Sequence, residues 1–358
     1  MELHFMGTAS AYPTPVRGAS CIIFRRDSDC WMFDCGEGSQ TQVMKSTIKP
    51  GKISKIFITH LHGDHVFGLP GLLCTIGQNS TPDRLLEIYG PQGLRKFLRV
   101  NLELSRSMLG FDYVVHELIP IREQCNCVKD WETWSVDHEA PRGPLHPYEK
   151  PGMSISADKQ GVWHLLEESG VSVKASWLTH RIPSFGFVIQ QASQPGRLNV
   201  DVLKAKGILP GPLYAKIKRG EAITAPSGEL VKPEDVLGPD KPGKKVVILG
   251  DTSNSDSIAS IAQGADVLVH ETTLENDMVE NAIEKGHSTP AMAAAFANMI
   301  GARHLIITHF SQRYRPVNAE ITDDCEDPSV LTLLKEAQEG FGLEKVTAAF
   351  DLMSFTIR

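Results

Sequence analysis

The sequence predicts a layered α/β fold. Two observations support this prediction: apolar runs of strand length recur along both halves of the chain, and several of them end directly at a histidine or an aspartate. Catalytic groups in layered α/β folds commonly lie where a strand gives way to a loop. With 358 residues, of which 41% are apolar, the chain can bury a large core. We therefore expect residues 1–358 to form a single domain, in two layers or with an internal duplication.

The first half of the chain, to about residue 115, has a strand-rich pattern and one clear helix. We expect strands near residues 2–6, 20–25, 30–34, 55–59 and 86–89, and a helix from Gln92 to Leu104. Residues 121–165 have little regular pattern and contain four prolines. We expect this stretch to form an irregular excursion.

The second half resumes near Val171, and its buried runs end at His180, Asp251, His270 and His309. The segment Ser288-Thr289-Pro290 predicts the start of a helix, because serine or threonine caps a helix and proline favours its first turn. We expect the body of this helix to run from Ala291 to Ile300.

The most informative segment is Thr59-His60-Leu61-His62-Gly63-Asp64-His65, which follows the apolar run Ile56-Phe57-Ile58. Residues two apart on an extended segment project to the same side, so His60 and His62 can bind one metal ion. After the turn at Gly63, Asp64 and His65 can reach a second ion. Imidazole and carboxylate suit Zn²⁺, although Mn²⁺, Fe²⁺ and Co²⁺ accept similar shells. The spacing predicts a dinuclear metallohydrolase.

Two ions need more ligands than one loop supplies, and three other predicted strands end at a candidate ligand. The runs 172–179, 245–250 and 303–308 lead into His180, Asp251 and His309, respectively. A carboxylate at Asp251 could bridge both ions. Taken singly, each of these residues would more often be structural than a ligand. As a set that completes two coordination shells, they favour a metal site.

This pattern resembles that of the metallo-β-lactamase superfamily. The resemblance implies a four-layer αβ/βα sandwich with a site for two zinc ions per subunit at one edge. It implies that His60, His62 and His180 bind the first ion, that Asp64, His65 and His309 bind the second, and that Asp251 bridges them. It does not name a substrate, because thioesters, lactones, sulfate esters and phosphodiesters are all hydrolysed on this fold.

The flanking motifs resemble those of tRNase Z, the endoribonuclease that removes the 3′ trailer from precursor tRNA. They occur in that family's order at residues 6–18, 33–38, 270–273, 286–289 and 308–314. The length is similar to that of the short form, and only the stretch near residues 121–165 is unmatched. The resemblance implies a zinc-dependent hydrolase that leaves a 3′-hydroxyl on the tRNA and a 5′-phosphate on the trailer.

The first loop departs from the family pattern. Many bacterial members have P-x-K-x-R-N where this chain has Pro13-Thr14-Pro15-Val16-Arg17-Gly18. The sequence therefore leaves open how tRNA that ends in CCA is treated.

A basic segment lies between the predicted strands that lead to His180 and Asp251. Although the net charge of the chain is −7, residues 196–220 contain one acid, Asp201, against the basic residues Arg197, Lys204, Lys206, Lys216, Lys218 and Arg219. Such a segment suits contact with the phosphates of RNA, although a charge run alone is more often a solvated surface. The tRNase Z resemblance implies an inserted arm that grips tRNA, in a homodimer where one subunit's arm presents the tRNA to the other subunit's active site.

Three further residues are candidates for catalysis or substrate binding beside Asp64, which can accept a proton from the attacking water. His287 is the candidate donor of a proton to the leaving oxygen, and Glu271 could hold and charge its ring. Arg313 could neutralise phosphate charge. His287 could instead brace its loop, and Arg313 could instead form a structural ion pair. We expect Asp34 to orient a metal-binding histidine.

The remaining sequence features limit the alternatives. No apolar run is long enough for a membrane span, no targeting segment is evident, and no nucleotide-binding loop is found, so we expect neither membrane association nor a nucleotide cofactor. Seven scattered cysteines indicate the cytosol, with the nucleus possible. Two other functions stay open: a small-molecule metallohydrolase of the glyoxalase II or arylsulfatase type, and a non-catalytic RNA-binding protein on a hydrolase scaffold.

Overall fold

The computed structural model describes residues 1–27, 29–78, 83–125, 144–317 and 328–357. The chain divides into two compact units. The first unit comprises Met1–Leu166, Val173–Ile189 and Lys245–Arg358, and the second comprises Glu167–Ser172 and Gln190–Lys244. The expected inserted segment, 196–220, therefore covers only part of a longer insertion.

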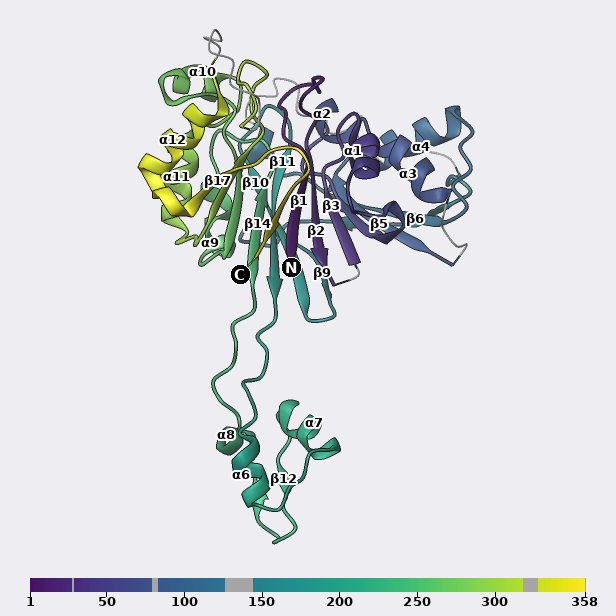
Figure 1. The fold of residues 1–358 in the computed structure, drawn as a ribbon. Coiled ribbons are helices and arrows are strands. Elements are labelled where there is room, and N and C mark those ends of the chain that lie inside the picture. Colours follow the sequence, from purple (N-terminus) through teal and green to yellow (C-terminus); the bar gives the residue numbers. More distant parts are fainter. Residues whose placement is uncertain (28, 79–82, 126–143, 318–327, 358) are drawn as a thin grey trace. The chain divides into compact units, whose positions relative to one another are not determined.

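Two large mixed sheets form the centre of the first unit (Figure 1). The first sheet has the order β18 (Met353–Thr356), β1 (Glu2–Gly7), β2 (Cys21–Arg26), β3 (Asp29–Phe33), β4 (Ile53–Phe57), β5 (Leu85–Pro91), β6 (Asp112–Leu118) and β7 (Glu149–Lys150), with β8 (Ser154–Ile155) also paired to β6. The second sheet has the order β17 (Val346–Ala348), β16 (Leu305–Thr308), β15 (Val267–Glu271), β14 (Lys245–Leu249), β11 (Ser184–Gln191), β10 (Val171–Leu178) and β9 (Val162–Glu168).

Helices cover the outer faces of both sheets, which gives the four layers that the resemblance implied (Figure 1). Against the first sheet lie α1 (Ser39–Lys45), α3 (Leu69–Gly77) and α4 (Leu94–Leu104), and α2 (Gly63–Val66) is a single turn within the metal-binding segment. Against the second sheet lie α9 (Ala259–Ala262), α11 (Pro290–Met299) and α12 (Val330–Phe341), and α10 (Val279–Glu284) lies at the top of this half in Figure 1. The predicted αβ/βα sandwich is confirmed.

Aromatic side chains fill the space between the two sheets. Phe187 of β11 lies 5.8 Å from Phe33 of β3 and 5.5 Å from Phe57 of β4, measured between ring centroids. Phe33 and Phe57 stack at 4.9 Å. These rings are fully buried, and burial of large aromatic surfaces stabilises the sheet-on-sheet packing.

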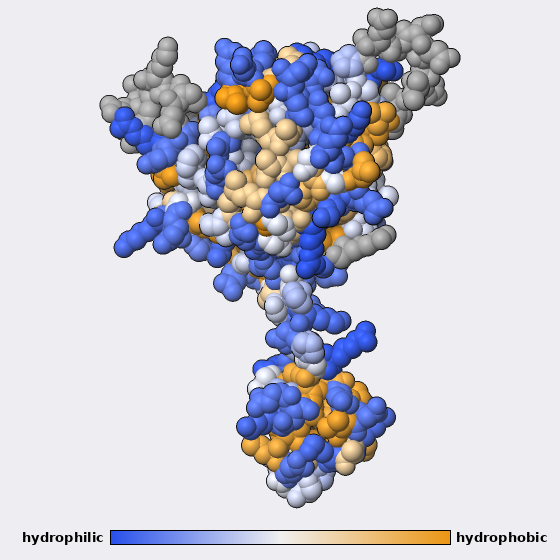
Figure 2. Space-filling model, turned by 90° about the vertical axis from the view of Figure 1, so that its left-hand side faces the viewer, coloured by the Kyte–Doolittle hydropathy of each residue, from blue (hydrophilic) through white to orange (hydrophobic). Residues whose placement is uncertain are grey.

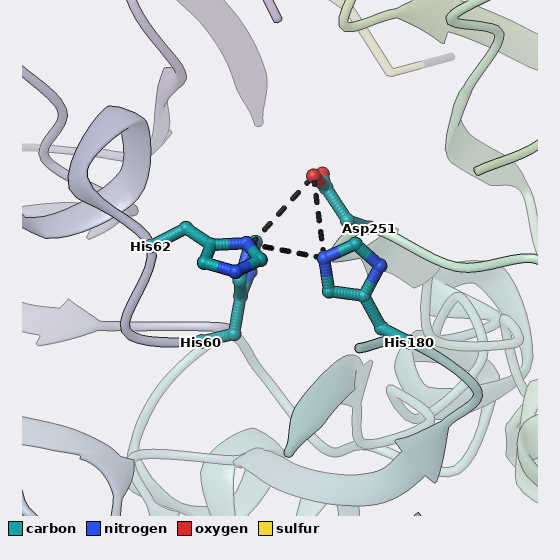
Figure 3. A group of neighbouring side chains, drawn as sticks. All are labelled: His60, His62, His180 and Asp251. Carbon is teal, nitrogen blue, oxygen red and sulfur yellow. Dashed lines mark hydrogen bonds and ion pairs between the residues drawn. The ribbon is translucent and has the colours of Figure 1, made fainter. Parts of the chain in front are cut away.

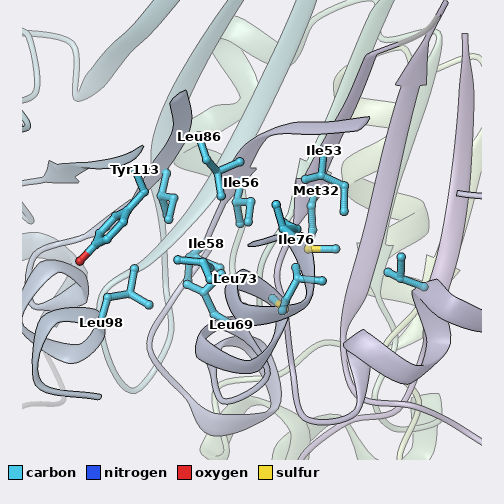
Figure 4. Close-up of a cluster of buried hydrophobic side chains, with 14 of the residues drawn as sticks. Met32, Ile53, Ile56, Ile58, Leu69, Leu73, Ile76, Leu86, Leu98 and Tyr113 are labelled. Atoms are coloured by element: carbon cyan, nitrogen blue, oxygen red, sulfur yellow. The ribbon is translucent and has the colours of Figure 1, made fainter. Parts of the chain in front are cut away.

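A second layer of core lies between the first sheet and its helices. Figure 4 shows Leu69, Leu73 and Ile76 of α3 packed among the strand residues Ile56 and Leu86. The strands β4 and β5 run parallel and are covered on both faces. Each strand has one charged residue among its apolar ones, Lys55 in β4 and Glu87 in β5, and these two side chains form an ion pair across the strands.

Four strands of the second sheet, β14 to β17, are parallel, as are β3 to β6 of the first sheet. Loops that leave the carboxyl ends of parallel strands meet at one edge of a sheet. The segment 58–65 follows β4, Asp251 follows β14, and His309 follows β16. The topology therefore brings residues from distant parts of the sequence to one place.

Several predicted boundaries were wrong. The helix expected from Gln92 begins at Leu94, because Gly93 takes a left-handed φ of 104° and the N–H groups of Gly93 and Arg95 donate to Glu117. The helix expected from Ala291 to Ile300 is α11, Pro290–Met299. Residues 162–165 of the expected irregular excursion belong to strand β9, and 126–143 lie outside the described residues.

The second unit has a small core of its own. It contains α6 (Val200–Ala205), α7 (Pro212–Lys218), the paired strands β12 (Ile223–Thr224) and β13 (Leu230–Val231), and α8 (Pro233–Val236). Its buried side chains are Leu203, Ile208, Ile217, Ile223, Ala225, Val231 and Val236. Apolar surface also remains exposed among its hydrophilic groups (Figure 2), including Leu209 and Leu230.

Within the described residues, none of the helices combines the length and the apolar character that a bilayer span requires.

We predict that Leu73→Ala lowers the free energy of unfolding by about 2–5 kcal/mol, because Leu73 is fully buried and its truncation leaves a cavity. Urea unfolding followed by circular dichroism measures the change. The matched control is Leu104→Ala in α4: Leu104 is 82% exposed, so its truncation should shift the free energy by less than about 0.5 kcal/mol. Equal effects of the two substitutions would contradict the packing described for α3.

Candidate metal centre

His60, His62, His180 and Asp251 converge to form the first ligand group (Figure 3). His60 Nε2 and His180 Nε2 each lie 3.1 Å from His62 Nδ1. Asp251 Oδ2 lies 3.7 Å from His60 Nε2 and 4.0 Å from His180 Nε2. Four ligands in a zinc tetrahedron lie roughly 3.3 Å apart, given bonds of about 2.0–2.1 Å. The donor atoms and their spacing therefore fit a divalent ion such as zinc.

Asp64, His65, His309 and Asp251 form the second group. His65 Nε2 and His309 Nε2 are 3.3 Å apart, and each lies 3.3 Å from Asp251 Oδ1. Asp64 Oδ2 lies 3.5 Å from His65 Nε2 and 3.4 Å from His309 Nε2. The two oxygens of Asp251 thus face different groups, which is the arrangement that a bridging carboxylate requires.

Hydrogen bonds on the far side of each ring fix its orientation. His65 Nδ1–H donates to Asp34 Oδ2 at 2.7 Å, and His180 Nδ1–H donates to the Gly286 carbonyl at 2.7 Å. His309 Nδ1–H donates to Thr273 Oγ1 at 3.0 Å. In each case Nε2 keeps its lone pair directed at the ligand group, as a metal ligand requires. Asp34 thus occupies the orienting position that the sequence predicted.

The electrostatics of the cluster also suit a cation. Burial lowers the pKa of His60 well below its usual value and lowers the pKa of His62 to about 4, so both rings are neutral and able to bind metal. Burial also disfavours charge on His65, but the carboxylates of Asp251, Asp64 and Asp34 outweigh this effect and raise the pKa of that ring. These buried carboxylates therefore favour positive charge among the ligand groups, and a divalent ion would supply it.

Asp64 contacts both the first loop and the second ligand group. Its Oδ2 accepts a 2.6 Å hydrogen bond from the Ala11 N–H and faces His65 and His309. Burial would raise the pKa of Asp64, but His65 and His309 hold it well below its usual range. The carboxylate is therefore ionised, and it links the second ligand group to the first loop.

His287 and Glu271 form a hydrogen-bonded pair beside the second group. His287 Nδ1–H donates to Glu271 Oε1 at 3.1 Å and lies 3.7 Å from Asp251 Oδ2. Burial disfavours the imidazolium, yet the charge of Glu271, this hydrogen bond and Asp251 together raise the pKa of His287 to about 9. The structure thus brings together the two residues that the sequence analysis paired, and their role in proton transfer stays a prediction.

A third set of potential ligands consists of Asp251, Glu271, His287 and His309. Glu271 already accepts hydrogen bonds from the N–H groups of Thr252 and Ser288 and from the hydroxyl of Thr273. Because its oxygens are engaged by these donors, we interpret Glu271 as an anchor for its neighbours rather than a metal ligand.

Three residues at the site have left-handed backbones although they are not glycine. The φ angles are 65° at Ala11, 59° at Asp34 and 61° at His309. Such conformations cost free energy and cluster at functional sites. They indicate that the placement of these groups, rather than local stability, determines the backbone here.

Known proteins resemble this chain over its full length. It is 46% identical over 363 residues to the human zinc phosphodiesterase ELAC protein 1, with 100% of this chain and 98% of the relative covered. It is 38% identical over 362 residues to ribonuclease BN of Cronobacter sakazakii, with both chains fully covered. The crystal structure of the short form of human tRNase Z, ELAC1, superposes with a TM-score of 0.69 at 36% identity, covering 100% of both chains.

The chain belongs to the tRNase Z family. Its first 109 residues also match the family model described as "Anti-Pycsar protein Apyc1". That match covers less than a third of the 358 residues, whereas the tRNase Z relatives cover the whole chain.

The candidate substrate-binding residues predicted from the tRNase Z resemblance lie at several places. Arg313 is exposed, and its Nη1 contacts the Met278 sulfur at 2.9 Å; among the described residues it forms no salt bridge. The basic residues of the second unit, Arg197, Lys204, Lys206, Lys216, Lys218 and Arg219, all reach its surface. Two of them are paired locally: Lys206 with Glu229, and Arg219 with Glu221 at 2.8 Å.

Sequence reasoning did not assign roles to several residues that order the tRNase Z site. Thr273 connects His309 to Glu271, and the Gly286 carbonyl holds His180. The buried Arg17 guanidinium donates to the carbonyls of Phe310, Ser311 and Tyr314, and so ties the first loop to the loop after His309. Thr273 and Arg17 lie within recognised motifs, but backbone acceptors leave no signal in a sequence.

We predict that Asp34→Asn weakens zinc binding by roughly 10- to 100-fold, because an amide presents a donor or a weaker acceptor to the His65 Nδ1–H. Competition with a chromogenic chelator measures the affinity. The control is Asp29→Asn, since Asp29 bonds only Trp31 Nε1 among the described side chains and lies outside the ligand groups. Unchanged zinc affinity in Asp34→Asn would show that this carboxylate does not orient a metal ligand.

Proposed function

We propose that this chain is a zinc-dependent endoribonuclease that removes the 3′ trailer from precursor tRNA. The observation that carries the proposal is the pair of ligand groups that share Asp251, in a chain that matches tRNase Z proteins over its full length. We propose two zinc ions per subunit, held by His60, His62 and His180 on one side, by Asp64, His65 and His309 on the other, and by Asp251 between them.

Divalent ions bound there would offset the charge of the phosphodiester and lower the pKa of a bound water. Asp64 would orient the attacking water and accept its proton, since its carboxylate is ionised and is held in place by the Ala11 N–H. Attack on phosphorus would break the bond to the ribose 3′-oxygen, leaving a 3′-hydroxyl on the tRNA and a 5′-phosphate on the trailer.

His287 would supply the proton that the leaving oxygen needs. Its Nδ1–H is engaged by Glu271, so Nε2 is the nitrogen that would donate. Glu271 favours the protonated ring, and it also connects His287 to His309 through Thr273. The proton donor and the second ligand group are therefore anchored on the same carboxylate.

The second unit would contribute contacts to the phosphates of the tRNA. Residues 190–244 contain nine lysines and arginines against six acids, a reversal of the net negative charge of the chain. Exposed Lys204, Lys216 and Lys218 form no salt bridge among the described residues. Such cations can contact phosphates and release counterions. Arg313, in the first unit, would also neutralise phosphate charge.

We further propose a homodimer in which the second unit of one subunit presents tRNA to the active site of its partner. This proposal rests on the family resemblance. We place the enzyme in the cytosol, with the nucleus as a second compartment, on the strength of the free cysteines Cys21, Cys30, Cys35 and Cys74.

We predict that the zinc-loaded protein cuts a precursor tRNA once, directly after the nucleotide that precedes the trailer. Mapping the cut at single-nucleotide resolution tests the function, and Asp64→Ala or removal of zinc with a chelator should abolish cleavage. A correct cut that Asp64→Ala leaves intact would refute the assignment of Asp64. Hydrolysis of a thioester or a sulfate ester without any RNA cleavage would instead favour the small-molecule hydrolase.

We predict that replacing Lys204, Lys216 and Lys218 together by glutamine weakens binding of precursor tRNA. The slope of log affinity against log salt should fall by roughly one for each phosphate that the variant no longer neutralises. Filter binding at several salt concentrations measures both quantities. Lys159, Lys335 and Lys345 of the first unit, replaced in the same way, control for the change in net charge. If both triple variants behave alike, the second unit is not the specific RNA-binding surface.

A further inference from the structure

A small pocket lies beside the first ligand group and has no role in the proposed chemistry. Its volume is about 120 Å³, and its lining includes His180, Arg181, Ser253, Ile283, Glu284 and Gly286. Pockets for drug-sized ligands typically measure about 300–1,000 Å³. A pocket of this size therefore suits one planar base rather than an extended ligand.

The pocket adjoins both the metal ligands and the proton donor. One wall is the His180 ring, whose Nδ1–H is bonded to the Gly286 carbonyl while its Nε2 lies 3.1 Å from His62 Nδ1. Gly286 has a φ of 77°, and a Cβ there would lie 2.7 Å from His180 Nδ1. The backbone at Gly286, directly before His287, therefore lies in close contact with the His180 ring.

The lining groups have the chemistry of a nucleobase site. The planar guanidinium of Arg181 and the 52% exposed side chain of Ile283 can contact the faces of a base. Glu284, together with Glu123 at the same pocket, offers acceptors for the exocyclic amino groups of adenine, cytosine or guanine. Two carboxylates would repel a phosphate, so the pocket favours a base over the RNA backbone.

Arg181 directly follows the candidate metal ligand His180, and both residues line the pocket. In the proposed reaction, His287 meets the oxygen that leaves, and that oxygen belongs to the last nucleotide of the tRNA body. The pocket is lined by Gly286, the residue directly before this proton donor. The base of the last tRNA nucleotide, which carries the leaving oxygen, would therefore lie close to the pocket.

We propose that this pocket holds the base of the last nucleotide before the trailer, and that Arg181, Ile283 and Glu284 set the preference of the enzyme for that base. The inference rests on the proposed function, because it assumes cleavage of RNA at the junction with the trailer. It adds a specificity site to the cleavage site.

The test uses the zinc-loaded full chain and seven precursor tRNAs: the parent sequence, three variants with the other bases at the last position of the tRNA body, and three with the other bases at the first position of the trailer. The readout is kcat/KM for each substrate. We expect Glu284→Gln to lower kcat/KM roughly tenfold for the preferred amino-bearing base at the last tRNA position, relative to uracil at that position. Glu280→Gln, one turn earlier on α10 and outside the pocket, is the matched control and should retain the wild-type preference.

Arg181→Ala should lower kcat/KM roughly tenfold for precursor tRNA relative to bis(p-nitrophenyl) phosphate, which carries no base. Arg181→Lys keeps the charge but loses the planar group, so it should recover only a small part of the loss.

Three outcomes would overturn the proposal. In the first, Glu284→Gln changes all four bases at the last tRNA position by the same factor. In the second, the change in preference follows the first trailer nucleotide. In the third, Arg181→Ala lowers hydrolysis of the small phosphodiester as much as that of tRNA. Failure of the proposed function looks different, because the wild-type protein would then cut none of the seven precursors at the junction.

Discussion

The buried carboxylate of Asp251 is the constraint on which the rest of the site depends. Its two oxygens face two sets of histidines, and it is held at the end of a parallel strand in the second sheet. A buried carboxylate is costly unless it is compensated. The first sheet supplies part of both ligand groups through the segment 60–65, and the second sheet supplies His180, Asp251 and His309. The stacking of the two sheets, fixed by Phe33, Phe57 and Phe187, therefore sets the distance between the ligands from the first sheet and those from the second. The packing of the core therefore determines the geometry of the metal site in this fold.

Glu271 performs a related task at the next strand of the sheet. It accepts two backbone hydrogen bonds, the hydroxyl of Thr273 and the ring N–H of His287. A fully satisfied buried network of this kind is rigid, because no member can move without leaving a polar group unpaired. The ring of His287 is therefore oriented by the same group that steadies His309. The network explains why the motifs 270–273, 286–289 and 308–314, which are far apart in sequence, occur together.

Much of the fold and the ligand set could be predicted because each relevant signal is local. The histidines of the segment 60–65 are concentrated in six positions, and the other candidate ligands each follow an apolar run that reads as a buried strand. The extent of the second unit was predicted too short, because only its basic residues form a recognisable pattern. Its core depends on Ile223, Val231 and Val236, which lie beyond the charged stretch and are too dispersed to form a pattern. The roles that sequence could not predict are those that depend on the main chain. The Ala11 N–H bonds Asp64, and the Gly286 carbonyl bonds His180, yet any residue has a carbonyl to offer and almost any has an N–H.

The two ends of the insertion that forms the second unit, residues 191–194 and 241–244, are joined by backbone hydrogen bonds, and we call this pair of segments the neck. The Gln191 N–H donates to the Lys244 carbonyl at 2.9 Å, and Gln194 and Lys241 exchange two backbone hydrogen bonds of 2.9 Å. Strands β11 and β14, which lead into and out of this neck, are neighbours in their sheet. Residues between 195 and 240 can therefore be lengthened, shortened or replaced without altering the register of the catalytic sheet. In evolutionary terms the inserted unit is a replaceable module, and substrate choice can diverge while the hydrolytic centre stays the same.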